Sequence, residues 1–130
     1  MTGVTQVDPF DLPDWLGTGE VTWLSPASIH HRHLVVGALN RPPDGAAEEL
    51  PCDLMAVDQA YPEAVLDEQW RSRAHREWTH DQVLLLQMGD RLTLAVPGTQ
   101  FTADRVLEVI GRLAKTVGAR PERFTVALRP

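Results

Sequence analysis

The segment Val83–Met88 constrains the fold more than any other stretch, because it is apolar on both of the faces that an extended chain presents. A strand of this kind needs cover on each side, which favours a central place in a sheet. The turn residues Gly89-Asp90 and the alternating stretch Arg91–Val96 follow it, and together they predict a β-hairpin. We therefore expect a sheet with this hairpin inside it.

Shorter segments around the hairpin also alternate between apolar and polar residues, which is typical of strands. Three of them precede the hairpin, at Glu20–Leu24, His31–Leu39 and Leu50–Val57, and a last strand carries Phe124, Val126 and Leu128 on one side. The first three strands are expected to form an antiparallel meander.

Two segments have helical signals. The first begins at Pro62, a residue suited to the first turn of a helix, and runs to about Trp78 with an apolar stripe. The second is bounded by Thr102, a good N-cap residue, and by Gly118, a good residue just after a helix end, with Lys115 in its last turn.

The predicted order is β-β-β-α-β-β-α-β. Two helices cannot supply the crossovers of an all-parallel sheet, so we predict an α+β fold with a mostly antiparallel sheet and both helices packed on one face. The length of 130 residues fits a single domain. Residues 1–18 show no periodicity and combine prolines, aspartates and aromatic residues, so we interpret them as an irregular acidic and aromatic N-terminal arm before a domain at 19–130.

Charge restricts the classes of partner. The chain has 12 Lys and Arg against 18 Asp and Glu, a net charge of −6, which opposes binding to nucleic acid or anionic lipid by bulk charge. No apolar run approaches the ~20 residues that span a bilayer, and the N-terminus lacks a basic start followed by an apolar stretch. We therefore expect a soluble cytoplasmic protein without a membrane partner.

Two residue counts add to this expectation. The lone cysteine, Cys52, excludes an internal disulfide and any zinc or iron–sulfur site built from several cysteines. Arginine occurs eleven times and lysine once, a bias typical of a bacterial protein from a GC-rich genome.

The charge is also unevenly distributed. Residues 1–68 hold 12 acidic and 2 basic side chains, and residues 69–130 hold 6 acidic and 10 basic ones. Part of this division fits the dipole of the first helix, whose arginines lie toward its C-terminal end. The rest suggests that the acidic arm faces an arginine-rich surface, within one chain or between two.

Catalytic chemistry finds little support. Cys52 is followed by Asp53, whose carboxylate disfavours a thiolate, and the loop Pro97–Thr102 lacks the glycines and the lysine of a phosphate-binding loop. We therefore predict a non-catalytic protein-interaction module of the adaptor, chaperone-like or regulatory kind, with another protein or a second copy of itself as partner. The predicted contact residues are Phe10, Trp15, Trp70, Arg71, Arg76 and Trp78.

The arm leaves two interpretations open. Either Phe10 and Trp15 cover the apolar surface of their own domain, or the arm binds a partner, for example by reciprocal exchange in a homodimer.

The alternative function is binding of a metal or a small ligand by the cluster His30–His33. In an extended chain His31 and His33 project from the same face ~7 Å apart, close enough to share a zinc ion. A third ligand would have to come from elsewhere, and the candidates are His75, His80, Cys52 and a carboxylate. The competing interpretation is a solvated start of a strand, and beyond this possible zinc site the sequence predicts no cofactor.

Overall fold

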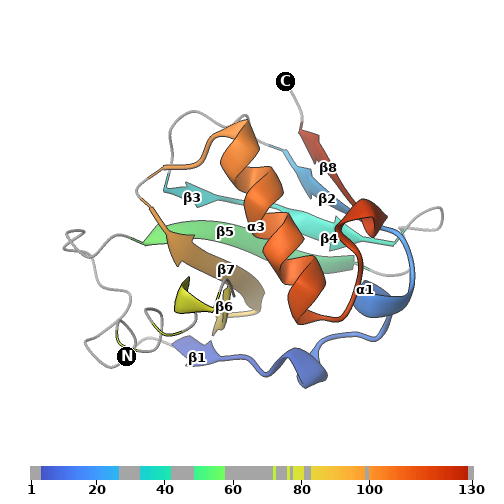
Figure 1. Cartoon of the computed structure of the whole chain (residues 1–130), viewed down its shortest axis with the longest axis horizontal. Helices are drawn as coiled ribbons and strands as arrows, with labels where there is room; N and C mark the ends of the chain where they lie inside the picture. Colours follow the sequence, from blue (N-terminus) through green and yellow to red (C-terminus); the bar gives the residue numbers. More distant parts are fainter. Residues whose placement is uncertain are drawn as a thin grey trace.

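The structure is a computed structural model that describes residues 4–26, 33–41, 49–57, 72, 76, 78–80, 83–98 and 100–128. In this part of the chain eight strands form one sheet, and helix α3 (Ala103–Thr116) lies across one of its faces (Figure 1). The predicted mixture of helices around a single sheet is thus confirmed. No helix of the described residues is long and apolar enough to cross a membrane.

The sheet has the order β1-β6-β7-β5-β4-β2-β8, and β3 pairs with β5 beside this path. The strands are β1 (Val4–Gln6), β2 (Val21–Ser25), β3 (Leu34–Val35), β4 (Ala38–Asn40), β5 (Glu49–Val57), β6 (Leu84–Met88), β7 (Arg91–Pro97) and β8 (Phe124–Leu128). Five of the seven described pairings are antiparallel, whereas β5–β7 and β2–β8 are parallel. The prediction of a mostly antiparallel sheet therefore fits only in part. Helix α3 carries the chain from β7 across the sheet to β8, which runs parallel to β2, and β5 runs parallel to β7.

The two local predictions with the clearest signals are confirmed. Hairpin β6–β7 turns at Gly89, which adopts a positive φ of 67°. Helix α3 begins at Thr102, whose Oγ1 accepts a hydrogen bond from the Arg105 amide at 3.2 Å, and Gly118 follows its end with a φ of 81°.

The predicted order of elements is wrong at two places. The expected strand His31–Leu39 is divided, where the structure describes it, into β3 and β4. The expected irregular arm contains three short elements, namely β1, the 3₁₀ turn η1 (Pro9–Asp11) and helix α1 (Trp15–Thr18). Each is too short to produce a recognisable period in the sequence. The division of the chain into an arm and a domain at residue 18 stays a prediction.

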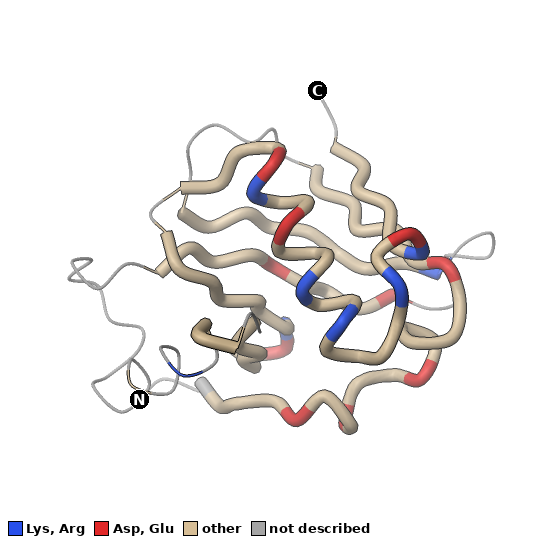
Figure 2. Tube along the Cα trace, viewed as in Figure 1, with Lys and Arg blue, Asp and Glu red and all other residues tan. Residues whose placement is uncertain are grey.

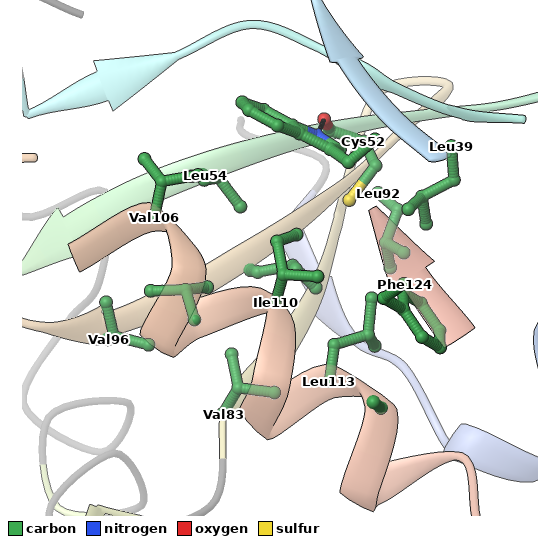
Figure 3. Packing of buried hydrophobic residues seen from close by; sticks show 14 of the residues in the cluster. Leu39, Cys52, Leu54, Val83, Leu92, Val96, Val106, Ile110, Leu113 and Phe124 are labelled. Atoms are coloured by element: carbon green, nitrogen blue, oxygen red, sulfur yellow. Dashed lines mark hydrogen bonds between the residues drawn. The ribbon is translucent and has the colours of Figure 1, made fainter. Parts of the chain in front are cut away.

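The main core fills the space between the sheet and α3. Figure 3 shows Val106, Ile110 and Leu113 of the helix pointing toward strand residues such as Leu54 and Leu92. All five are buried, as the predicted apolar face of this helix requires.

A second, smaller cluster forms on the opposite face of the sheet. It consists of Met55, Leu84, Leu86 and Ala95, and the half-buried Trp78 packs against it. Trp78 is helical and belongs to the segment predicted as the first helix. The expectation that both helices lie on one face is therefore wrong for the described part of that segment. The reason is that β6 is apolar on both sides, so each face needs its own cover.

Candidate interaction surface

The N-terminal segment is fixed on the domain at both of its ends. Strand β1 pairs with β6, and the amide of Val7 continues the ladder by donating to the Leu85 carbonyl at 2.8 Å. Leu16 of α1 is fully buried in the main core, and Trp15 packs against that core from outside. The strand β1 and the helix α1 therefore hold the residues between them in a fixed position on the domain.

Between the anchors, residues 8–14 form what we call the Phe10 turn. The Asp8 carboxylate caps η1 by accepting from the Phe10 amide at 3.0 Å, and the amides of Asp11 and Leu12 donate to the carbonyls of Asp8 and Pro9 at 2.8 and 3.2 Å. Pro9 restricts the backbone further because its ring fixes φ. This local bonding defines the direction in which Phe10 projects.

The side chain of Phe10 is 94% exposed, although apolar residues close to it in the sequence pack against the core. Val7, Leu12 and Trp15 all pack against the main cluster. The expectation that Phe10 and Trp15 together cover their own domain is thus confirmed for Trp15 and wrong for Phe10. Burial of a phenylalanine side chain is worth roughly 1.5–3 kcal/mol, and this gain is not realised within the chain.

Charge is segregated around the Phe10 turn. Asp8, Asp11 and Asp14 are exposed along it. Close to the end of α3, Figure 2 shows a group of basic residues on the helix and on the following 3₁₀ turn η2 (Pro121–Arg123). We call this group the basic end, and it consists of Arg112, Lys115, Arg120 and Arg123.

Two residues of the basic end, Arg112 and Lys115, line a shallow hollow of about 260 Å³, the α3 hollow. Gly111 and Pro121 line it, and a Cβ atom at Gly111 would meet nothing within 4 Å. Arg112 and Lys115 contribute its positive side, and the 56% exposed Leu107 lies one helical turn before Gly111. The hollow thus has no side chain at Gly111, and its rim carries two cationic groups and the Glu108 carboxylate.

Among the residues that the structure describes, Glu108 is the one carboxylate that forms ion pairs with this part of α3. Glu108 accepts from Arg105 Nη1 at 3.0 Å and from Arg112 Nη2 at 2.7 Å, so two guanidinium groups share it. Arg112 Nη1 is buried and has no hydrogen-bond acceptor in the described part of the chain. The α3 hollow therefore keeps an excess of positive charge.

The Phe10 turn and the α3 hollow are neighbours on the surface. Lys115 lines the α3 hollow and also a second hollow of about 330 Å³, which Pro9 lines from the turn. A third hollow of about 320 Å³ lies between Phe10 and Val117, just after α3. Small-molecule sites have volumes of ~300–1,000 Å³. The α3 hollow is smaller than this, and the other two hollows are at the low end of the range. The surface is better suited to contact with a protein.

A separate polar cluster lies at the break between β3 and β4. The Asp53 carboxylate accepts from the Gly37 amide at 3.2 Å and from Arg91 Nη2 at 2.8 Å, and Arg91 Nη2 also donates to the Gly37 carbonyl at 2.8 Å. Asp53 raises the pKa of Arg91 by this hydrogen bond. The main-chain groups freed by the break are satisfied here, so the cluster supports the fold.

Cys52 is fully buried beside this cluster. Burial raises the pKa of its thiol, and the nearby Asp53 carboxylate raises it further. A thiol in this environment is a poor nucleophile.

The other predicted site residues are distributed as follows. Trp70, Arg71 and His31 lie outside the described residues. Arg76 is helical and exposed, and Trp78 packs on the second cluster. A role for these residues in partner contact stays a prediction.

The metal site is likewise neither supported nor overturned. His33 is exposed. No group of three or more His, Cys, Asp or Glu side chains suited to a metal occurs among the residues that the structure describes. Zinc binding by His31 and His33 stays a prediction.

The basic end was not among the contact residues predicted from the sequence, although the sequence contains two signals for it. Arg112 and Lys115 are one helical turn apart, so they lie on the same side of the helix. Gly111 is a poor helix former within a segment of residues that otherwise favour a helix. Comparison with protein-family models, curated proteins and solved structures found no match to this chain.

Proposed function

We propose that this chain is a non-catalytic protein-interaction module and that the Phe10 turn is its main contact. The observation that carries the proposal is the 94% exposure of Phe10 on a turn whose flanks are anchored in the sheet and the core. An adaptor or regulatory role follows naturally from such a contact.

The physical support comes from how protein interfaces gain affinity. Aromatic side chains supply much of the binding energy of interfaces when they enter a pocket of the partner. A contact that is ordered before binding loses less conformational entropy in the complex. Asp8 and Asp11 flank Phe10, so the partner surface should combine an apolar pocket with a basic rim.

Site-specific photo-crosslinking tests the proposal. The photoreactive residue p-benzoylphenylalanine replaces Phe10 in one variant and Leu128 in a matched control. Leu128 lies on β8 and is 38% exposed. Illumination is done in the native cells at native expression level and with the purified chain. We expect covalent protein adducts from position 10 and few from position 128. Absence of adducts at position 10 in both samples would overturn the proposal.

A further inference from the structure

We infer that the partner of the Phe10 turn is a second copy of this chain, with each turn seated in the α3 hollow of the other. This inference rests on the proposed function, since it names the partner of the same turn. It makes the basic end the other half of the interface.

The two surfaces complement each other in shape and charge. The Phe10 turn offers one projecting aromatic side chain between Asp8 and Asp11. The α3 hollow offers the open space above Gly111 with Lys115 on its rim. An aromatic ring in that space would lie against Gly111 and Pro121. Its flanking carboxylates would meet Arg112 and Lys115, which outnumber the one carboxylate of the lining, Glu108.

The charges of both surfaces are available for such a contact. In the part of the chain that the structure describes, Asp8, Asp11 and Asp14 form no ion pair. Lys115 and Arg120 form none either, and Glu108 is shared between two arginines. Complementary charge at the rim of an interface favours association and fixes its orientation.

The placement of the two surfaces permits a closed dimer. Lys115 contributes to the α3 hollow and to the hollow beside Pro9, so turn and hollow adjoin on one side of the molecule. In Figures 1 and 2 the N-terminal segment accordingly passes the C-terminal end of α3. A two-fold axis near Lys115 would allow both reciprocal contacts to form at once. Such a contact closes on itself and does not continue into a filament.

Reversal of the charges on each of the two surfaces, in two separate variants, provides the test. One variant carries Asp11→Lys and Asp14→Lys, and the other carries Lys115→Glu and Arg120→Glu; all four side chains are exposed, so both variants should fold. Each variant alone brings like charges together at both contacts. In an equimolar mixture, both contacts of a heterodimer become complementary again.

Sedimentation velocity at low salt measures the outcome. We expect the wild type to be a dimer, each variant alone to have a dissociation constant raised at least about tenfold, and the mixture to recover the dimer. Gly111→Gln supplies an independent variant, because it fills the α3 hollow and replaces glycine by a better helix former. It should abolish the dimer without lowering thermal stability.

Several results would overturn the inference. One is a wild type that stays monomeric at concentrations of about 100 μM, where even a weak specific dimer is populated. Another is a dimer that persists in Gly111→Gln and in both charge variants. If position 10 crosslinks only to a different protein while the chain is monomeric, the inference fails and the proposed function stands. If position 10 gives no adduct at all, both fail.

Discussion

Gly37 shows how the absence of one side chain permits the packing of a large core residue. A Cβ atom at this position would lie 2.4 Å from the indole ring of Trp23, which is fully buried. The close approach allows Trp23 Nε1 to donate to the Cys52 carbonyl at 2.9 Å. The absence of a side chain at Gly37 is therefore a condition for the packing of the largest core residue.

Gly37→Ala should accordingly destabilise the fold. Overpacking of a filled core costs about 1–3 kcal/mol, and the contact here is with a rigid ring, so we expect a loss in the upper half of that range. Urea unfolding followed by tryptophan fluorescence measures it. Gly19→Ala is the control, because a Cβ atom there meets nothing within 4 Å. Equal midpoints for the two variants would contradict the packing argument.

Asp53 is a second residue whose substitution should lower the stability of the fold. Asp53→Ala removes the acceptor of both Arg91 and the Gly37 amide, and we expect it to cost about 2–4 kcal/mol in the free energy of unfolding. Glu49 lies exposed on the same strand β5 and provides the control. The free energy of unfolding of Glu49→Ala should stay within about 0.5 kcal/mol of that of the wild type. Similar losses for the two variants would show that the network contributes nothing specific.

Cys52 gives a direct probe of core opening. Because its thiol is fully buried and its pKa is raised by that burial, a thiol reagent should label it only when the chain unfolds. We expect no labelling in native buffer over the minutes in which the denatured chain reacts completely. Rapid labelling of the native protein, followed by absorbance, would place Cys52 outside the core.

Among the elements, α3 depends on local signals that its own sequence contains. Thr102→Ala removes the hydroxyl that accepts from the Arg105 amide, and this should cost about 1 kcal/mol, whereas Thr102→Ser should retain most of the stability. Thermal unfolding of both variants distinguishes the lost cap from a general effect of substitution. A Thr102→Ser variant as unstable as Thr102→Ala would contradict capping as the cause.

The elements also show what a sequence can and cannot predict. Helix α3 and hairpin β6–β7 were predictable because their caps, turn and periodicity are local. Gly37, between β3 and β4, lies against the ring of Trp23, which belongs to the different strand β2. Strand β1 exists through its pairing with β6, about eighty residues later in the chain. Contacts of this range leave no periodic signal in a short segment.

The same limit applies to the candidate interaction surface. Phe10 and the aspartates around it could be selected from the sequence, because their composition is unusual for an element of the core. That Phe10 is exposed while Trp15 packs inward could not, since both are apolar residues without a surrounding period. The hollow at Gly111 needs η2 as its opposite wall, and η2 reaches it only in the folded chain.

For the molecule as a whole, the uneven charge of the sequence has a spatial counterpart. Acidic residues follow the Phe10 turn, and basic residues gather at the C-terminal end of α3 beside the α3 hollow (Figure 2). An interface between these surfaces depends on charge, so added salt should weaken it. We expect the dimer dissociation constant to rise as sodium chloride increases from about 0.05 to 0.5 M, as measured by sedimentation equilibrium. A constant that falls with salt would indicate an apolar interface elsewhere.

Sedimentation velocity tests whether Phe10 contributes to the dimer contact. The experiment compares Phe10→Ala with the wild type and with the control Leu128→Ala. Phe10 is almost entirely exposed, so its truncation should leave the fold of the monomer unchanged, as judged by circular dichroism. We predict that the wild type and Leu128→Ala sediment as dimers and that Phe10→Ala sediments as a folded monomer. A Phe10→Ala chain that sediments like the wild type would contradict the role of the Phe10 turn in self-association.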